Sequence, residues 1–370
     1  MTGFDVDIAC AAIFAICIFY TTIGGIKAVM WTDTFQAAVM FGSFLAIIIK
    51  GNHDAGGASI VFDRNYQSGR MEFFNFDLHL TTRHTVWTMV VGGYFTWVGT
   101  YGTNQTQIQR YLTVPDKSKV ISAIWWNMLG IAFLLIMCAY AGLVVFAFYD
   151  IHQCDPIQAD LVDKPDQLFP LFVMQVMGDI PCVPGLFVAG VFSGALSTVS
   201  SGMNSLAAVI IQDIVVGAME KQISEKRKTV LTKVIALCCG LISYAVVFVV
   251  KYLPGVLEAS LGLFGMAGGP ILGAFTLGMF VPWANSLVRF FFCKNCGLVT
   301  DFRQILKGAF IGMLTSLGFG VWMMLGQNLA KNYGTYQSGM SVKPTTIEGC
   351  PIDLYNETTT TEAPEPSDSE

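Results

Sequence analysis

The sequence predicts an all-α membrane protein, a bundle of about eight transmembrane helices. Of its 370 residues, 54% are hydrophobic and only 13% are charged, and its mean hydropathy is +0.57. A soluble domain needs more charge than this to cover its surface. The apolar residues also form blocks long enough to cross a hydrocarbon core about 30 Å thick. We therefore expect the lipid bilayer as a partner and one transmembrane domain over 1–330.

The expected spans are separated by charged residues, glycines and prolines. In chain order they cover 8–24, 33–50, 84–108, 119–149, 182–217, 229–251, 255–281 and 305–327. The glycine pair Gly24 and Gly25 ends the first span, and Asp33 can cap the second. The fourth span is long for one crossing and should tilt. Pro270 should kink the seventh span because it removes a backbone hydrogen bond.

The connections between the spans alternate between basic and acidic. Lysines and arginines collect after the first, third, fifth and seventh spans, whereas segment 150–181 holds six aspartates and one lysine. Because positive charge stays on the cytoplasmic side, we expect the N-terminus and the tail 331–370 to be extracellular. The end of the tail is rich in Thr, Pro and acidic residues, so the tail should be disordered. Asn356 begins a sequon there and is expected to be glycosylated.

Composition excludes several classes of function. The chain has no basic patch with interleaved aromatics, so nucleic acid is not an expected partner. All four histidines lie in expected outer loops or at a span edge, so we expect neither an enzyme nor a cofactor. Cys293 and Cys296 have no second ligand pair and predict no zinc site. Cys154, Cys182 and Cys350 lie in expected outer segments, and a disulfide between the first two is possible.

The span 182–217 is the strongest candidate for chemistry. Ionisable groups are nearly absent from the span centres, so an ion there must be bound by hydroxyl and carbonyl oxygens, which are hard ligands that suit an alkali cation. Helical spacing places one set of small and hydroxyl residues on a single face. These residues are Gly194, Ser197, Thr198, Ser201 and Ser205. Helix packing through small residues and hydroxyls is an alternative that the spacing leaves open.

Two other segments also suggest a transport path. The span 84–108 carries four glycines between positions 92 and 102, among polar and aromatic residues. Irregular backbone at membrane depth is tolerated where it lines a cavity, as in the broken helices of secondary transporters. A glycine-rich packing face is the alternative. Asp33, in turn, is either a helix cap or a carboxylate at the inner mouth of an ion path.

Three segments, 24–33, 103–112 and 196–201, resemble the sodium/solute symporter family that includes the sodium–glucose transporters. They are most similar to the branch of sodium-coupled monocarboxylate, sodium-dependent multivitamin and sodium/iodide transporters. The resemblance implies a LeuT-like fold of two inverted five-helix repeats, with the second repeat over about 84–281. On that template the first repeat lacks three helices, and the family's final span is missing.

By position, the resemblance implies two sodium sites, a sodium exit route and a substrate region. The shared sodium site falls on Gly194, Ser197 and Thr198. The second sodium site falls on Ser200 and Ser201, and the exit route passes Asp33. The substrate region on the broken third span comprises Trp97, Thr100, Tyr101 and Asn104.

The function that the resemblance implies is sodium-coupled symport of a small organic anion across the plasma membrane by alternating access. Na⁺ is the coupling ion and the only expected metal. Ile131 and Leu261 stand where sugar-transporting relatives have polar sugar contacts, which favours a monocarboxylate, a vitamin-like carboxylate or an iodide-like anion. Two alternatives are a truncated, non-transporting membrane subunit and an incomplete gene model of such a transporter.

Overall fold

A computed structural model of the chain describes most of its length. The described residues are 6–71, 73–79, 82, 84–162, 165–180, 182–218, 224–250, 256–280, 312, 314–323, 325, 326, 329 and 345–350. All regular elements in these ranges are helices, and no strand occurs among them. This confirms the predicted all-α class.

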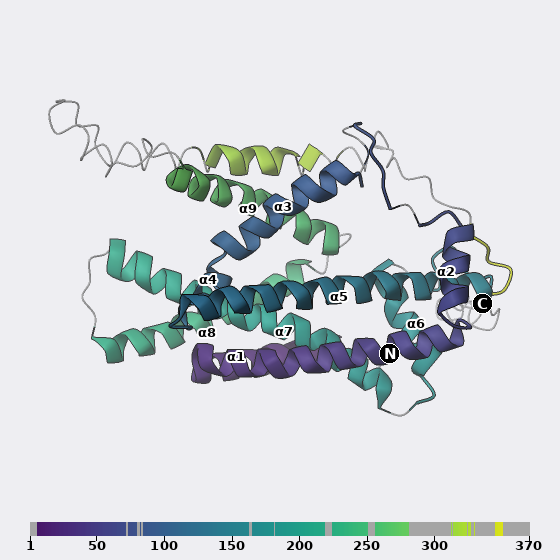
Figure 1. Cartoon of the computed structure of the whole chain (residues 1–370). Helices are drawn as coiled ribbons and strands as arrows, with labels where there is room; N and C mark the ends of the chain where they lie inside the picture. The colour runs from purple at the N-terminus through teal and green to yellow at the C-terminus, as the bar shows by residue number, and fades with distance from the viewer. Residues whose placement is uncertain are drawn as a thin grey trace, which may run out of the picture. The chain divides into compact units, whose positions relative to one another are not determined.

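The helices fall into long and short elements (Figure 1). The long ones are α1 (Val6–Asp54), α5 (Lys117–Ile151), α7 (Val183–Val209), α8 (Glu225–Val250) and α9 (Val256–Phe280). The short α-helices are α2 (Ala58–Gln67), α3 (Gly93–Val98), α4 (Gln105–Leu112) and α6 (Leu168–Met177). Three π-helical segments and one 3₁₀ turn complete the set: η1 (Thr88–Gly92), η2 (Gly99–Thr103), η4 (Ile210–Ala218) and η3 (Pro165–Gln167).

The chain divides into two compact units. The first unit consists of Met1–Glu72, Ile121–Ala245 and Val342–Glu370, and so contains α1, α2, α6, α7 and most of α5 and α8. The second unit consists of Phe73–Val120 and Val246–Ser341, and so contains the segment from η1 to α4 together with α9.

Five helices in the described ranges are long and apolar enough to cross a membrane. They are Asp7–Asp54, Lys117–Ile151, Val183–Gly217, Glu225–Phe248 and Gly262–Phe280. The first of these covers two of the expected spans, because α1 is broken near its middle. Large apolar side chains such as Phe19 and Phe35 on α1 and Trp126 on α5 are more than two-thirds exposed. Faces of this kind suit acyl chains or other apolar helices.

The break in α1 lies at Gly25, as the glycine pair predicts. Gly25 has φ 60° and ψ −157°, a conformation that residues with a Cβ rarely adopt. The two arms of α1, residues 6–24 and 26–54, fold back on each other. The Tyr20 hydroxyl lies near the Gln36 side chain, although sixteen residues of straight helix would separate them by about 24 Å.

Both arms of α1 pack along α7 (Figure 1). On the first arm, Cys17 and Ile18 form a buried cluster with Met203 of α7. On the second arm, Ser43 lies so close to Gly190 of α7 that a Cβ at Gly190 would overlap the Ser43 hydroxyl. A larger buried cluster extends over the second arm, α2, α5, α6 and α7, with Phe172 of α6 only 1% exposed. These contacts hold α1 and α7 in one register.

Residues 345–350 are tied to the first unit by a disulfide and backbone hydrogen bonds, whereas the sequence predicts a disordered tail over 331–370. The disulfide joins Cys154 to Cys350, and not to Cys182, which is a free and exposed cysteine. Two backbone hydrogen bonds support it: the Asp155 amide donates to the Thr346 carbonyl at 2.9 Å, and the Gly349 amide donates to the Gln153 carbonyl at 3.0 Å. This part of 331–370 is therefore an ordered strap on the first unit. Asn356 and the cysteines at 293 and 296 lie outside the described residues.

Candidate functional site

The hydroxyl groups of α7 lie mostly inside the first unit. Ser193, Ser200, Ser201 and Ser205 are all less than 9% exposed, and Ser200 has no exposed surface. The Ser205 hydroxyl donates to the Ser201 carbonyl at 2.9 Å. A polar face of this kind is buried only where it meets other polar groups or a ligand.

The second arm of α1 brings a carboxylate to this face. Asp33 Oδ2 accepts a hydrogen bond from the Ser201 hydroxyl at 3.4 Å, near the upper limit for such a bond. The two residues are 168 positions apart in sequence, so the contact depends on how α1 packs on α7. The Asp33 side chain thus reaches a neighbouring helix, which local sequence could not establish.

Further oxygen atoms gather beside this contact. The Tyr20 hydroxyl accepts a hydrogen bond from the Cys17 thiol at 3.6 Å and lies near the side chains of Ser200 and Gln36. Thr21 and Gln36 are 1% and 9% exposed. Thr21 lies beside the Cys17 thiol, yet Thr21 Oγ1, Thr22 Oγ1 and Gln36 Oε1 meet no partner at hydrogen-bonding geometry within the described part of the chain. We call this set the oxygen cluster; its members are Tyr20, Thr21, Asp33, Gln36, Ser200 and Ser201.

The chemistry of the oxygen cluster suits a small monovalent cation. It combines one carboxylate with neutral hydroxyl and amide oxygens, all of them hard ligands. No group of three or more His, Cys, Asp or Glu side chains that could hold a metal occurs among the described residues. Asp33 supplies the one carboxylate of the oxygen cluster, and a carboxylate beside hydroxyl oxygens is a ligand set that a small cation can coordinate. Buried hydroxyl and amide oxygens that have no hydrogen-bond partner in the described ranges are available to such a cation.

The sequence did not predict that Tyr20, Thr21 and Gln36 belong to the candidate site. The available signal was the polar run Tyr20-Thr21-Thr22, which ends two residues before the first glycine of the pair at 24 and 25. Sequence alone could not place this run against Gln36, because the fold-back angle at Gly25 decides which side chains of the two arms meet.

The residues expected for the shared sodium site lie one to two turns away on α7. The Thr198 hydroxyl donates to the Gly194 carbonyl at 3.1 Å, and the Ser197 carbonyl accepts from the Ser200 hydroxyl at 3.1 Å. Thr198 is exposed and Ser197 is half-buried. Gly194 faces Met40 on the second arm of α1. Of the expected sodium residues, the structure joins Ser201 directly to Asp33. A sodium-binding role for all six expected residues stays a prediction.

The expected substrate residues all lie in the second unit, on an interrupted helix. The segment changes from π-helix at η1 to α-helix at α3 and back to π-helix at η2. It then breaks at Asn104, whose backbone is extended at φ −74° and ψ 121°. The Asn104 side chain accepts a hydrogen bond from the Thr106 amide and caps α4. The predicted irregular backbone is confirmed, and such π-helical turns are frequent at functional sites.

Two aromatic rings stack along this interrupted helix. The ring centroids of Trp97 and Tyr101 are 5.8 Å apart with an interplanar angle of 24°. Between them, the Thr100 hydroxyl donates to the Thr96 carbonyl of its own helix at 2.9 Å. The four expected residues are thus neighbours on one segment, and their role in substrate binding stays a prediction.

Comparison with known proteins gives consistent similarities. The sodium:solute symporter family matches residues 1–287. Sodium-coupled monocarboxylate transporter 1 of Xenopus laevis is 37% identical over 350 residues, which are 95% of this chain and 52% of that protein. Sodium-coupled monocarboxylate transporter 2 of Homo sapiens is 37% identical over 326 residues, covering 88% of this chain and 49% of that protein.

Two further similarities support the same grouping. The putative sodium-dependent multivitamin transporter of Drosophila melanogaster is 34% identical over 331 residues, 88% of this chain and 51% of that protein. A solved structure of a Na⁺-coupled sialic acid symporter, substrate-bound and outward-open, aligns with a TM-score of 0.67 at 23% identity, over 86% of this chain and 66% of that one. The structural similarity supports the LeuT-like fold. The chain spans about half the length of the curated relatives it matches.

Proposed function

Because the chain belongs to the sodium:solute symporter family, we propose that it acts in sodium-coupled symport of a small organic anion across the plasma membrane by alternating access. The names of its relatives favour a monocarboxylate or a vitamin-like carboxylate, with an iodide-like anion as a further candidate. In this proposal Na⁺ is cargo and coupling ion, and no cofactor takes part.

The observation that carries the proposal is the contact between Asp33 and Ser201 inside the oxygen cluster. Asp33 would hold sodium through its carboxylate, with Ser200 and Ser201 supplying hydroxyl oxygens. Bound sodium would then offset the charge of Asp33 and link the second arm of α1 to α7. An ion that binds one arrangement of these helices more tightly shifts the protein toward that arrangement, which is how an ion gradient drives a conformational cycle.

The remaining expected residues complete the proposed path. The other sodium site would lie on α7, one to two turns from the oxygen cluster, and would consist of Gly194, Ser197 and Thr198. The substrate would contact Trp97, Thr100, Tyr101 and Asn104. The stacked rings offer apolar surface, and the helix break at Asn104 offers backbone groups for hydrogen bonds.

We further propose that the N-terminus and the segment 331–370 face the extracellular side. The disulfide between Cys154 and Cys350 supports this orientation. Disulfides persist in oxidising compartments, and both cysteines lie in the segments that the distribution of lysine and arginine places outside. Glycosylation of Asn356 would follow from the same orientation.

Binding of ²²Na⁺ to the purified full chain tests the central site without requiring transport. We expect Asp33→Asn to weaken sodium binding about tenfold or more, because it removes the one negative charge that faces the ion. Ser201→Ala should weaken binding severalfold. Ser193→Ala is the matched control, since it removes an equally buried hydroxyl on the same helix outside the oxygen cluster. Equal sodium affinity in all three variants and the parent would refute the site.

Uptake measurements then test coupling. In proteoliposomes that contain the full chain, labelled butyrate should accumulate when sodium is outside and should not when N-methylglucamine replaces it. Asp33→Asn should shift the sodium concentration for half-maximal uptake in the same direction as it shifts ²²Na⁺ binding. An equal rate of butyrate uptake with and without the sodium gradient would exclude symport.

A further inference from the structure

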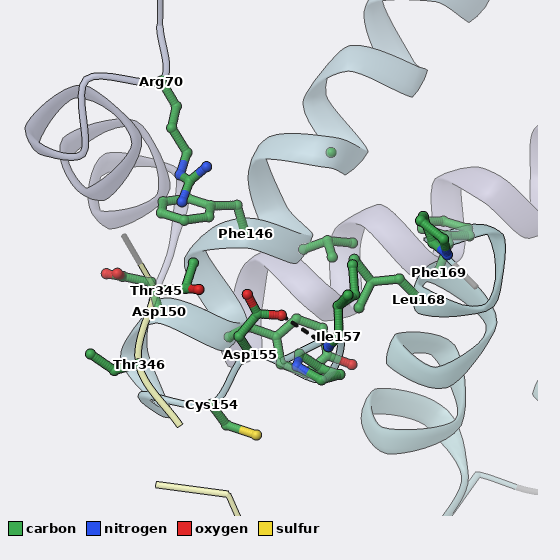
Figure 2. A pocket seen from close by; sticks show the side chains of 15 residues that line it. Arg70, Phe146, Asp150, Cys154, Asp155, Ile157, Leu168, Phe169, Thr345 and Thr346 are labelled. Carbon is green, nitrogen blue, oxygen red and sulfur yellow. Dashed lines mark hydrogen bonds between the residues drawn. The ribbon is translucent and has the colours of Figure 1, made fainter. Parts of the chain in front are cut away.

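A second polar site lies at the disulfide end of the first unit, away from the oxygen cluster. A cavity of about 420 Å³ opens there between the end of α5, the start of α6, the strap 345–350 and Arg70, which follows α2 (Figure 2). We call it the disulfide-end cavity. Its volume falls in the range of small-molecule sites. Its lining residues belong to the first unit alone.

Arg70 supplies a cation to this cavity that no carboxylate of the described residues pairs with. Its guanidinium lies over the ring of Phe146, 4.3 Å from the centroid (Figure 2). Its Nε atom is buried and has no hydrogen-bond partner, and Arg70 forms no ion pair, among the residues that the structure describes. Stacking uses the face of a guanidinium and leaves its edge for hydrogen bonds. The planar group that best matches that edge is a carboxylate.

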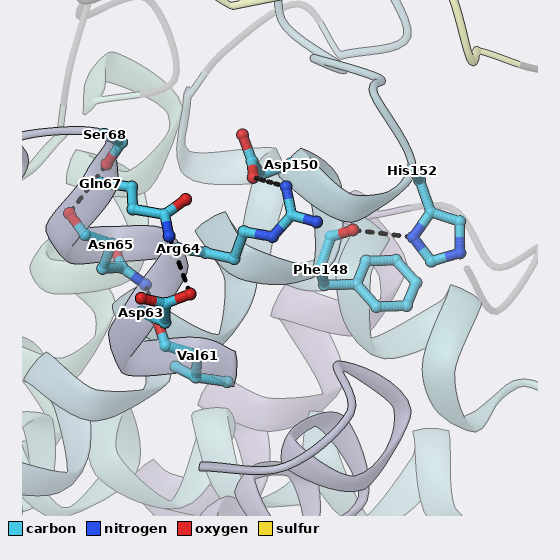
Figure 3. Close-up of polar contacts among 9 residues, drawn as sticks. All are labelled: Val61, Asp63, Arg64, Asn65, Gln67, Ser68, Phe148, Asp150 and His152. Atoms are coloured by element: carbon cyan, nitrogen blue, oxygen red, sulfur yellow. Dashed lines mark hydrogen bonds and ion pairs between the residues drawn. The ribbon is translucent and has the colours of Figure 1, made fainter. Parts of the chain in front are cut away.

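The two carboxylates in the cavity wall have donors of their own. Asp150 Oδ2 accepts from Arg64 Nη1 at 3.2 Å (Figure 3). Asp155 Oδ1 accepts from the backbone amide of Ile157 at 2.9 Å and more weakly from that of Gln158 at 3.5 Å. Among the described residues, Arg70 is therefore the charged side chain of the cavity wall whose buried donor has no hydrogen-bond acceptor. A carboxylate ligand would accept a hydrogen bond from this donor and balance the charge of Arg70.

The rest of the lining selects an apolar body for this ligand. Phe146, Leu168 and Phe169 form apolar walls, and Ile157 adds to them. Thr345 and Thr346 of the strap line the polar side, and Thr345 Oγ1 is buried with no partner in the described ranges. The backbone bond from the Asp155 amide to the Thr346 carbonyl and the disulfide at Cys154 hold the strap in place.

We propose that the disulfide-end cavity binds a small carboxylate with an apolar body, through the Arg70 guanidinium and the hydroxyl of Thr345. The lining of this cavity includes none of the expected substrate residues, which belong to the second unit. Binding here needs no sodium, because no residue of the oxygen cluster lines the cavity. The proposal does not rest on symport, so either can fail while the other stands.

Calorimetric titration of the purified full chain with butyrate tests this site, in sodium-free N-methylglucamine chloride. We expect the parent protein to bind butyrate. Arg70→Lys should weaken binding about tenfold or more, because lysine keeps the charge and loses the planar fork. Arg70→Ala should abolish binding. Arg64→Lys is the matched control: the same exchange at an arginine on α2 that does not line the cavity, with an expected change of less than about twofold.

Several results would overturn the proposal. They are no butyrate binding by the parent protein, binding only when sodium is present, or equal losses in Arg70→Lys and Arg64→Lys. Butylammonium provides a test of charge, since it has the same apolar body and the opposite sign. Tighter binding of butylammonium than of butyrate would mean that Asp150 and Asp155 dominate the cavity.

Discussion

The oxygen cluster and the disulfide-end cavity both contain buried polar atoms without a hydrogen-bond partner in the described part of the chain, but the atoms differ in kind. In and beside the oxygen cluster the unmatched atoms are oxygens of Thr21, Thr22 and Gln36. At the disulfide-end cavity they are the Arg70 Nε and the Thr345 hydroxyl. Unmatched oxygens beside a carboxylate favour a cation, and an unmatched guanidinium favours an anion.

The structure around the cavity shows what matched polar groups look like. Asn65 is 1% exposed, and its Nδ2 donates to the Val61 carbonyl at 2.8 Å and to the Leu143 carbonyl at 2.9 Å. Figure 3 shows Asn65 and Val61 on α2, together with the ion pair of Arg64 and Asp150. Such groups stabilise the fold. The difference suggests that stability and ligand binding depend on different buried polar residues in this protein.

The largest expected effect on stability comes from the disulfide. Cys350→Ser should lower the free energy of unfolding by about 2–4 kcal/mol, because the bond between Cys154 and Cys350 closes a loop of 196 residues. It should also release the strap from the disulfide-end cavity and weaken butyrate binding, with ²²Na⁺ binding unchanged. Thermal unfolding in detergent measures the first effect.

Cys182→Ser is the control for the disulfide, since Cys182 is exposed and free. If both serine variants lowered the unfolding temperature equally, the strap would not be what stabilises this end. If Cys350→Ser weakened sodium binding as well, the two regions would not be independent.

A matched pair of substitutions sharpens the comparison between matched and unmatched polar groups. Asn65→Leu should lower the free energy of unfolding by about 1–3 kcal/mol, because it removes two buried hydrogen bonds. Thr21→Val should change it by less than about 1 kcal/mol or raise it, because the lost hydroxyl has no partner at bonding geometry in the described ranges. Sodium binding should respond in the opposite order, weaker in Thr21→Val and unchanged in Asn65→Leu.

Thermal unfolding and ²²Na⁺ binding of both variants measure this pair. A large loss of stability in Thr21→Val would show that its hydroxyl is matched in the folded protein. The oxygen cluster would then be a packing network, as hydroxyl groups in helix bundles often are.

The smallest expected effect belongs to the ion pair at the surface. The side chains of Arg64 and Asp150 are 46% and 35% exposed, so solvent screens their attraction. Arg64→Gln should lower the free energy of unfolding by about 0–1 kcal/mol, and salt should reduce even this difference. A loss as large as that of Asn65→Leu would mean that the pair holds α2 on α5.

Local patterns predicted much of the fold and part of the site. The positive φ at Gly25 and the break at Asn104 follow from glycine-rich stretches that a regular helix does not favour. The face of α7 with Ser201 and Ser205 follows from helical spacing, and three of the α7 serines beyond position 199 are buried. The partner of Cys154 was not predictable, since three cysteines in expected outer segments satisfied the same local rule.

By itself, the sequence determined that this protein is a helical membrane protein of the sodium:solute symporter family, because hydropathy, helical period and short motifs are properties of neighbouring residues. Only the tertiary structure decided that Asp33 meets Ser201, that Gln36 lies beside Tyr20, and that Arg70 has no carboxylate partner in the described ranges. Those contacts depend on how each helix is rotated about its axis and on the angle at which α1 folds back. Packing of the whole unit sets both quantities.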